Sequence, residues 1–192
     1  MKTCVLFIQG GGQGAHVEDG VLAKSLEHAL GSEFEVRYPH MLGESEPDFS
    51  VWTQQISSML AEIEGDVILV GHSLGGAALL NYLAENTCER SIAGLFLLAA
   101  PSWDKDKWNF DELKLPRNVS ERLAAIDPIF FYQCCDDEVV PFEHLALHEA
   151  QFPNATTRVL SSGGHQFCNG LQLVAEDIQN STNSSGVRSH HK

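Results

Sequence analysis

Short apolar runs alternate with longer amphipathic stretches along most of the chain. Six of these runs are rich in branched residues and nearly unbroken, as expected for strands that are covered on both faces. The predicted strands are Cys4–Ile8, Phe34–Tyr38, Val67–Val70, Ile92–Leu98, Ile129–Gln133 and Thr157–Leu160. Such alternation is typical of βαβ units, so it predicts an α/β domain built on a mostly parallel sheet.

Five stretches between these runs have the length or the apolar spacing of helices. The predicted helices are roughly Val17–Leu30, Phe49–Ile63, Leu74–Glu85, Phe142–Gln151 and Leu171–Gln179. With about six strands and helices on both faces of the sheet, residues 1–179 are expected to form a single domain.

Two segments fit neither pattern. Residues 101–125 carry Trp103, Trp108, Phe110 and Pro116 among charged residues. A connection of this length either forms a short cap over a site or is held down by its aromatic residues. Residues 180–192 are polar and low in complexity, which predicts a disordered tail.

The composition limits the classes of partner. With 192 residues, 43% of them hydrophobic, the chain can form the core of one domain. Asp and Glu total 26 against 12 Lys and Arg, and the formal net charge is −14. Such a charge repels phosphate backbones and anionic lipids, which argues against nucleic acid and membranes as partners. Its simplest interpretation is a solvated surface.

The cysteines and the amino terminus indicate a cytoplasmic protein. Five cysteines cannot all pair within one chain, and none of them forms a C-x-x-C motif. The first apolar run, Cys4–Ile8, is too short for the core of a signal peptide. Reduced thiols in the cytoplasm are therefore expected.

A candidate nucleophile lies between the third predicted strand and the third predicted helix. Gly71, His72, Ser73, Leu74 and Gly75 form a G-x-S-x-G sequence in the strand–turn–helix context that this motif requires. Its sharp turn needs small residues two positions from the serine, and the helix amino terminus favours negative charge beside it. His72 is expected to pack rather than react. The alternative is a glycine-rich turn with an incidental serine.

A serine hydroxyl needs a base to take its proton. Among nine histidines, His165 lies in a glycine turn after the last predicted strand, where a catalytic histidine would follow the serine and an acid. The alternative is a solvent-exposed loop histidine. His144 and His148 have the i, i+4 spacing of a metal pair, but no other feature completes a metal site, so a solvated helix face is expected.

The glycine-rich loop after the first strand has three interpretations. As an oxyanion loop, it would supply the N–H of Gly11 to act together with the N–H of Leu74. As a dinucleotide fingerprint it offers only Gly10-x-Gly12-x-x-Ala15, and the acidic residue expected after the second strand is absent from Val36–His40. No cofactor is therefore expected. A purely structural glycine turn is the third possibility.

These motifs resemble the α/β-hydrolase superfamily and, within it, the small retinoblastoma-binding protein 9-like serine hydrolases. The resemblance spans roughly residues 3–178 and is most specific at the glycine loop, at Gly71–Gly76, at Asp136–Pro141 and at Gly163–His165. It implies a compact hydrolase core that lacks the superfamily's first two strands, with a minimal cap and carboxylesterase-like activity. Gln9 departs from the histidine of many relatives, and this departure is expected to affect only loop packing.

The acid of a catalytic triad would follow the fifth strand, where Asp136 and Asp137 stand. Neighbouring residues of an extended segment project to opposite sides, so only one of them can face His165. In the resembling family the acid stands four residues before the proline of an Asp-x-x-Val-Pro turn. The resemblance therefore implies Asp137, four residues before Pro141, with Asp136 capping the turn or facing solvent.

The sequence thus predicts a serine hydrolase that acts on ester-like or amide-like bonds of small acyl substrates. Ser73, His165 and Asp137 would form the triad, and the N–H groups of Gly11 and Leu74 would form the oxyanion hole. No metal or cofactor is expected, and the oligomeric state stays open. The alternative is a catalytically silent protein that uses the hydrolase fold as a protein-binding scaffold, because fold alone does not establish activity.

Overall fold

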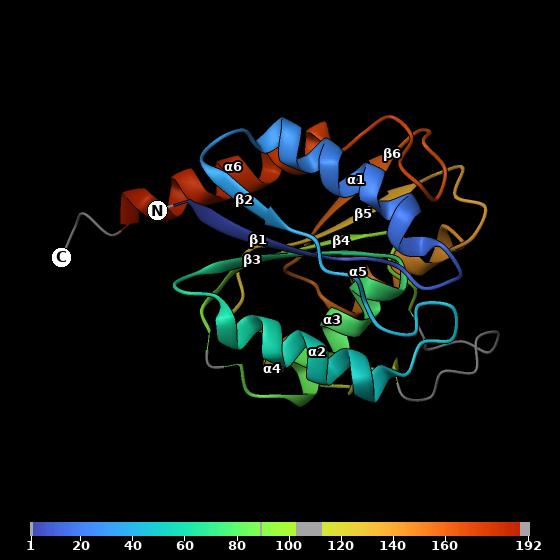
Figure 1. Ribbon diagram of the computed structural model, residues 1–192, viewed down its shortest axis with the longest axis horizontal. Coiled ribbons are helices and arrows are strands. Elements are labelled where there is room, and N and C mark those ends of the chain that lie inside the picture. Colours follow the sequence, from blue (N-terminus) through green and yellow to red (C-terminus); the bar gives the residue numbers. More distant parts are fainter. Residues whose placement is uncertain (1, 89, 103–112, 189–192) are drawn as a thin grey trace.

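The computed structural model describes residues 2–88, 90–102 and 113–188, and it is built around one six-stranded sheet (Figure 1). All strands are parallel, and their order across the sheet is β2-β1-β3-β4-β5-β6. The strands are β1 (Thr3–Ile8), β2 (Phe34–Arg37), β3 (Val67–His72), β4 (Ile92–Leu98), β5 (Ile129–Cys134) and β6 (Thr156–Leu160).

Helices cover both faces of this sheet. They are α1 (Ala15–Leu30), α2 (Phe49–Glu62), α3 (Leu74–Glu85), α4 (Val119–Arg122), α5 (Glu143–Gln151) and α6 (Gln172–Arg188). Figure 1 shows α1 and α6 on one face and α2, α3, α4 and α5 on the other. The α/β fold class with a parallel sheet and helices on both faces is thereby confirmed.

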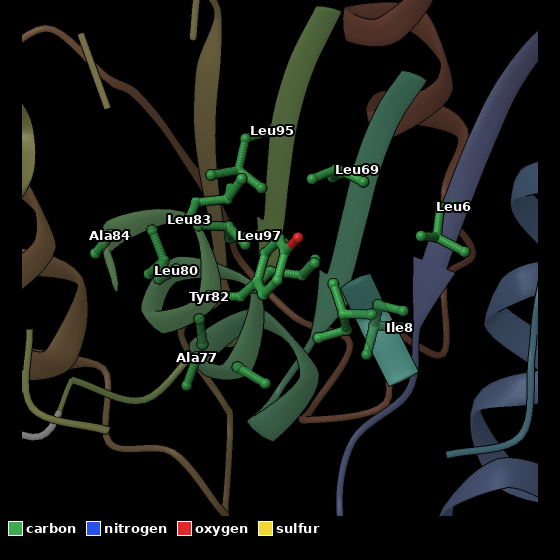
Figure 2. Packing of buried hydrophobic residues seen from close by; sticks show 14 of the residues in the cluster. Leu6, Ile8, Leu69, Ala77, Leu80, Tyr82, Leu83, Ala84, Leu95 and Leu97 are labelled. Carbon is green, nitrogen blue, oxygen red and sulfur yellow. The ribbon is translucent and has the colours of Figure 1, made fainter. Parts of the chain in front are cut away.

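Alternate side chains of each central strand enter two separate hydrophobic cores. Leu6 and Ile8 of β1 pack on the side of α3 (Figure 2). Trp52 of α2 is fully buried in the same core. Val5 and Phe7 of the same strand pack on the side of α1 and α6. Because both faces of the sheet are covered, the side chains that point to either face are apolar. This explains the unbroken apolar runs of the sequence.

Most expected boundaries lie within one or two residues of the observed ones, and three differences matter for the description of the fold. The four-residue helix α4 was not expected, because one turn is too short to show an apolar period. Strand β3 includes two residues more than expected, Gly71 and His72. Helix α6 continues to Arg188, so residues 180–188 are helical where the sequence predicts a disordered tail. Within this polar stretch the Thr182 hydroxyl donates to the Ile178 and Gln179 carbonyls of the preceding turn.

Residues 101–125 are described only in part. Trp103, Trp108 and Phe110 lie outside the described residues, so a cap over the site stays a prediction. From residue 113 onward the segment is anchored, since Leu113 and Val119 are each 1% exposed and belong to the core under α3.

The parallel topology sets the place of the site. All strands point the same way, so the segments that follow β1, β3, β5 and β6 leave the same edge of the sheet. In open α/β sheets this carboxyl edge is where ligands bind. The glycine loop, Ser73, Asp137 and His165 all lie in these four segments.

Candidate active site

Ser73 occupies a strained turn between β3 and α3. Its φ and ψ are 50° and −123°, a conformation that residues other than glycine seldom adopt. Two sets of backbone hydrogen bonds hold it: Ser73 N donates to Leu98 O at 2.8 Å, and Ser73 O accepts from Gly76 N and Ala77 N. Hydrogen bonds thus hold this turn to the end of β4 and to the first turn of α3.

Close backbone approach explains the glycines around Ser73. A Cβ atom on Gly71 would lie 2.6 Å from Gly76 Cα, and one on Gly75 would collide with the carbonyl oxygens of Ile8 and Gln9. No side-chain rearrangement relieves contacts with backbone atoms. The small residues that the motif requires are therefore needed here to pack the start of α3 against the ends of β1 and β3.

Asp137 and His165 form a hydrogen-bonded pair beside this turn. His165 Nδ1 lies 3.0 Å from Asp137 Oδ2 and 3.1 Å from Oδ1. The Asp137 side chain is fully buried, and its carboxylate also accepts from Gln133 Nε2 and from the N–H groups of Val139 and Val140. Burial alone would raise the pKa of Asp137, but the hydrogen bonds from the His165 ring and the backbone outweigh it and hold this pKa below its usual range.

Asp136 and Glu138 bind the backbone of the His165 loop instead. Asp136 accepts from the N–H groups of Gly163 and Gly164 at 3.2 and 2.9 Å. Glu138 Oε2 accepts from His165 N at 3.2 Å. Of the two neighbouring aspartates, Asp137 is the one whose carboxylate contacts the His165 ring, and Asp136 joins the two loops.

Ser73 and His165 line one cavity, together with Gly11, Leu74 and Glu138. The cavity has a volume of about 420 Å³, within the usual range for small-ligand pockets. Within residues 2–88, 90–102 and 113–188, Ser73 Oγ makes no hydrogen bond to the His165 ring. Bonds between a nucleophile and its base are often loose in ligand-free enzymes and tighten when substrate binds.

The N–H groups of Gly11 and Leu74, which lie beside this cavity, have no acceptor among the described residues. Gly10 N donates to Asp19 Oδ2, Gly12 N to the Glu44 carbonyl, and Ser73 N to the Leu98 carbonyl. Neither Gly11 N nor Leu74 N donates a hydrogen bond to any other described residue. These are the two N–H groups that the sequence analysis assigns to an oxyanion hole. Because Gly10 N and Gly12 N are already bonded, the loop is also poorly suited to hold a dinucleotide pyrophosphate.

Gln9 organises the loops behind these N–H groups. It is fully buried, and its side chain donates to Glu44 Oε2 at 2.7 Å and accepts from Met41 N and His16 Nδ1. Glu44 in turn accepts from Gly14 N and His16 N. Gln9 thus connects the glycine loop with the segment that carries Met41 and Glu44.

The expectation of a solvated helix face for His144 and His148 is wrong for His148. His148 is 2% exposed, stacks on Phe131 and donates from Nε2 to the Ala100 carbonyl. His144 Nδ1 accepts from Ser102 N at 2.9 Å. Within the part of the chain that the structure describes, no group of three His, Cys, Asp or Glu side chains could hold a metal ion.

Sequence reasoning missed Asp19. It lies on α1 and is 1% exposed, and its Oδ2 is 2.8 Å from His72 Nδ1. The signal was available in the sequence, because Asp19 shares a helical stripe with the buried residues Ala15, Leu22 and Leu26. An acid on the apolar side of a helix needs a buried partner.

Comparison with known proteins supports the fold and assigns a family. The crystal structure of the ydeN gene product from B. subtilis has a TM-score of 0.77 at 17% identity, covering 95% of this chain and 100% of that chain. A pyrethroid hydrolase from Sphingobium faniae scores 0.62 at 18% identity, covering 94% and 97%. The methylesterase MES16 from Arabidopsis scores 0.64 at 16% identity, covering 94% and 99%. These likenesses confirm the α/β-hydrolase fold.

No curated protein matches the chain significantly by sequence. Among the described residues, no helix has both the length and the apolar character needed to cross a membrane.

The model of the family described as serine hydrolase matches residues 19–171, which is most of the chain. The chain therefore belongs to the serine hydrolase family.

Proposed function

We propose that this hydrolase cleaves ester-like or amide-like bonds of small acyl substrates through a Ser73–His165–Asp137 triad and an acyl-enzyme. The observation that carries the proposal is the Asp137–His165 hydrogen bond of 3.0 Å beside the cavity into which the Ser73 turn opens. A nucleophile, a histidine and a buried carboxylate that orients the histidine are the groups that acyl transfer requires.

In the first half of the reaction His165 Nε2 takes the proton of Ser73 Oγ while this oxygen bonds to the substrate carbonyl carbon. The negative charge that develops on the carbonyl oxygen is stabilised by the N–H groups of Gly11 and Leu74. When the tetrahedral intermediate collapses, the bond to the leaving group breaks and His165 delivers the proton to it. Asp137 stabilises the imidazolium that exists in between.

In the second half, water replaces the leaving group. His165 takes a proton from the water as its oxygen attacks the acyl carbon, and the bond between Ser73 Oγ and this carbon then breaks. The proton returns to Ser73 Oγ, and the carboxylic acid leaves. Every group that this mechanism uses belongs to the chain, to the substrate or to water, so the mechanism as proposed has no step on a metal or cofactor.

The cavity supports a small substrate that carries no negative charge. Its volume of about 420 Å³ must hold the acyl part and the leaving group together. Glu18 and Glu138 line it, and no Lys or Arg does so among the described residues. A substrate carboxylate would be repelled by these side chains. We propose neutral short-chain esters or amides as the substrate class.

We also propose that the enzyme acts in the cytoplasm and does not bind nucleic acid. All five cysteines are free thiols, which suits a reducing compartment. The formal net charge of −14 opposes association with a phosphate backbone.

A fluorophosphonate probe tests the proposed nucleophile, because it reacts with activated serines. We expect the native protein to be labelled and Ser73→Ala to stay unlabelled. Ser58→Ala is the matched control, since Ser58 is an exposed serine on α2 whose hydroxyl donates to the Gln54 carbonyl. Folded native protein that resists the probe would contradict the proposal and favour a catalytically silent scaffold.

A further inference from the structure

A second carboxylate–imidazole pair lies directly behind the proposed catalytic one. Asp19 and His72 are each 1% exposed, and Asp19 Oδ2 is 2.8 Å from His72 Nδ1. The other ring nitrogen of His72 is 2.9 Å from the backbone carbonyl oxygen of His165. The ring centroids of His72 and His165 are 4.8 Å apart.

The two contacts of His72 define its protonation. A neutral imidazole donates from one nitrogen only, whereas both nitrogens of His72 face oxygen acceptors. The His165 carbonyl cannot donate a proton. Asp19 Oδ2 already accepts from Gly10 N at 2.7 Å, as an ionised carboxylate does. With Asp19 ionised, the two contacts require His72 to be an imidazolium that donates to both neighbours.

The electrostatics of the pair agree with this geometry. Burial alone would lower the pKa of His72, but the Asp19 carboxylate and the His165 carbonyl outweigh burial and raise it. Burial alone would raise the pKa of Asp19, yet the hydrogen bonds from His72 and Gly10 leave it below its usual range. The titratable groups around the His72 ring are Asp19 on α1, His165 before α6 and, further away, Asp137 after β5.

The pair joins three parts of the candidate active site. Asp19 fixes Gly10, which precedes the free N–H of Gly11 in the glycine loop. His72 precedes Ser73 in the chain and holds the backbone of His165. Nucleophile, base and oxyanion loop thus share one buried hydrogen-bonded connection, formed by two side chains that have no step in the proposed mechanism.

We infer that Asp19 and a permanently protonated His72 are positioning residues that set the place of His165 and of the glycine loop relative to Ser73. This inference rests on the proposed function. Asp137 orients the His165 ring through Nδ1, whereas His72 fixes the backbone from which this ring projects. Without the pair, all three triad residues are still present, but His165 and the glycine loop are displaced relative to Ser73. This lowers the rate of the chemical step more than it weakens substrate binding.

Nitrogen NMR of the wild-type protein tests the protonation state without any variant. We expect both ring nitrogens of His72 to show imidazolium shifts at pH 8, where an ordinary histidine is neutral. A neutral His72 ring at this pH would overturn the inference. This readout does not depend on activity, so it separates the inference from the proposed function, which fails if native protein resists the fluorophosphonate probe.

Kinetics of Asp19→Asn and His72→Gln with p-nitrophenyl acetate test the positioning role. We expect kcat to fall roughly 10- to 100-fold in each folded variant while KM stays within about threefold. The matched control is Tyr132→Phe, which removes a buried hydrogen bond of 2.9 Å to Asp177 away from the cavity. It should lose stability and keep its kcat.

A folded Asp19→Asn or His72→Gln protein with the kcat of Tyr132→Phe would overturn the positioning role. The positioning role is supported if Asp19→Asn, His72→Gln and Tyr132→Phe lose similar stability but only the first two lose kcat. A merely structural pair would affect kcat no more than the control substitution does. If neither variant folds, the NMR measurement on the wild-type protein decides between a charged pair and a neutral one.

Discussion

Both carboxylate oxygens of Asp137 lie within hydrogen-bond distance of His165 Nδ1, at 3.0 and 3.1 Å, although the two residues are 28 positions apart in the chain. The loops that carry them are also joined through Asp136 and the backbone of Gly163 and Gly164. With Nδ1 engaged by Asp137, the His165 ring has one nitrogen left for a reacting group. The ring of the proposed base is therefore oriented by Asp137, while Glu138 and His72 hold its backbone.

Asp137→Asn should lower kcat by about three to four orders of magnitude, because the His165 ring then loses its tautomer preference and the stabilisation of its imidazolium. Steady-state kinetics on an activated ester measure this effect. Asp136→Asn is the matched control, since it removes the neighbouring carboxylate and leaves the Asp137–His165 pair in place. The assignment is reversed if Asp136→Asn is the inactive variant and Asp137→Asn is not.

His148 should make the protein less stable in acid. Burial lowers the pKa of His148 to about 4. Its unfolded pKa is about 6.5, so the unfolded chain binds more protons between these values. Stability is thus retained above pH 6.5 and decreases as the pH falls toward 4, by up to about 3 kcal/mol.

Urea unfolding of wild type and His148→Gln at pH 7 and pH 4.5 measures this contribution. Glutamine can still donate to the Ala100 carbonyl but cannot be protonated, so the variant should lose less stability than the wild type between the two pH values. Equal losses in the two proteins would contradict a pKa of His148 that is lower in the folded protein than in the unfolded chain.

Two glycines should respond in opposite ways to an added methyl group. In Gly75→Ala the new Cβ would collide with the carbonyl oxygens of Ile8 and Gln9, so we expect a loss at the upper end of about 1–3 kcal/mol in the free energy of unfolding. In Gly20→Ala, within α1, the nearest atom is Tyr38 Cε1 at 3.7 Å, an ordinary contact. This variant should gain about 0.5–1 kcal/mol. A destabilised Gly20→Ala protein would contradict the packing described for α1.

Short acyl chains should be the better substrates. The cavity of about 420 Å³ has to accept both the acyl part and the leaving group, so kcat/KM should be higher for acetyl and butyryl esters than for chains beyond about ten carbons. A series of p-nitrophenyl esters, with Ser73→Ala as the blank, measures this preference. A rate that keeps rising with chain length would show that a larger acyl pocket exists.

Much of the fold could be predicted from the sequence because the sheet is buried on both faces. The central strands are continuous apolar runs, and their boundaries lie within two residues of the expected ones. The polar composition of residues 180–188 predicts disorder, but α6 continues through Ser181 and Thr182 into this stretch with few apolar residues. One-turn helices such as α4 leave no periodic signal at all.

The candidate site could be predicted only where a motif fixes local geometry. The G-x-S-x-G turn and the Asp-x-x-Val-Pro turn each place one side chain in a known context, and the structure brings Asp137 and His165 together. The Asp19–His72 pair joins residues 53 positions apart. No local pattern reports such a contact, although an acid on an apolar helix stripe shows that some buried partner must exist.

The acyl-enzyme itself is the most direct test of the account. After brief mixing with p-nitrophenyl acetate at low pH, which slows the water step, intact-protein mass spectrometry should show one added acetyl group, and peptide analysis should place it on Ser73. The same treatment should leave Ser73→Ala unmodified. Release of p-nitrophenol at equal rates by wild type and Ser73→Ala, with no acetylated Ser73 peptide, would contradict covalent catalysis by this residue.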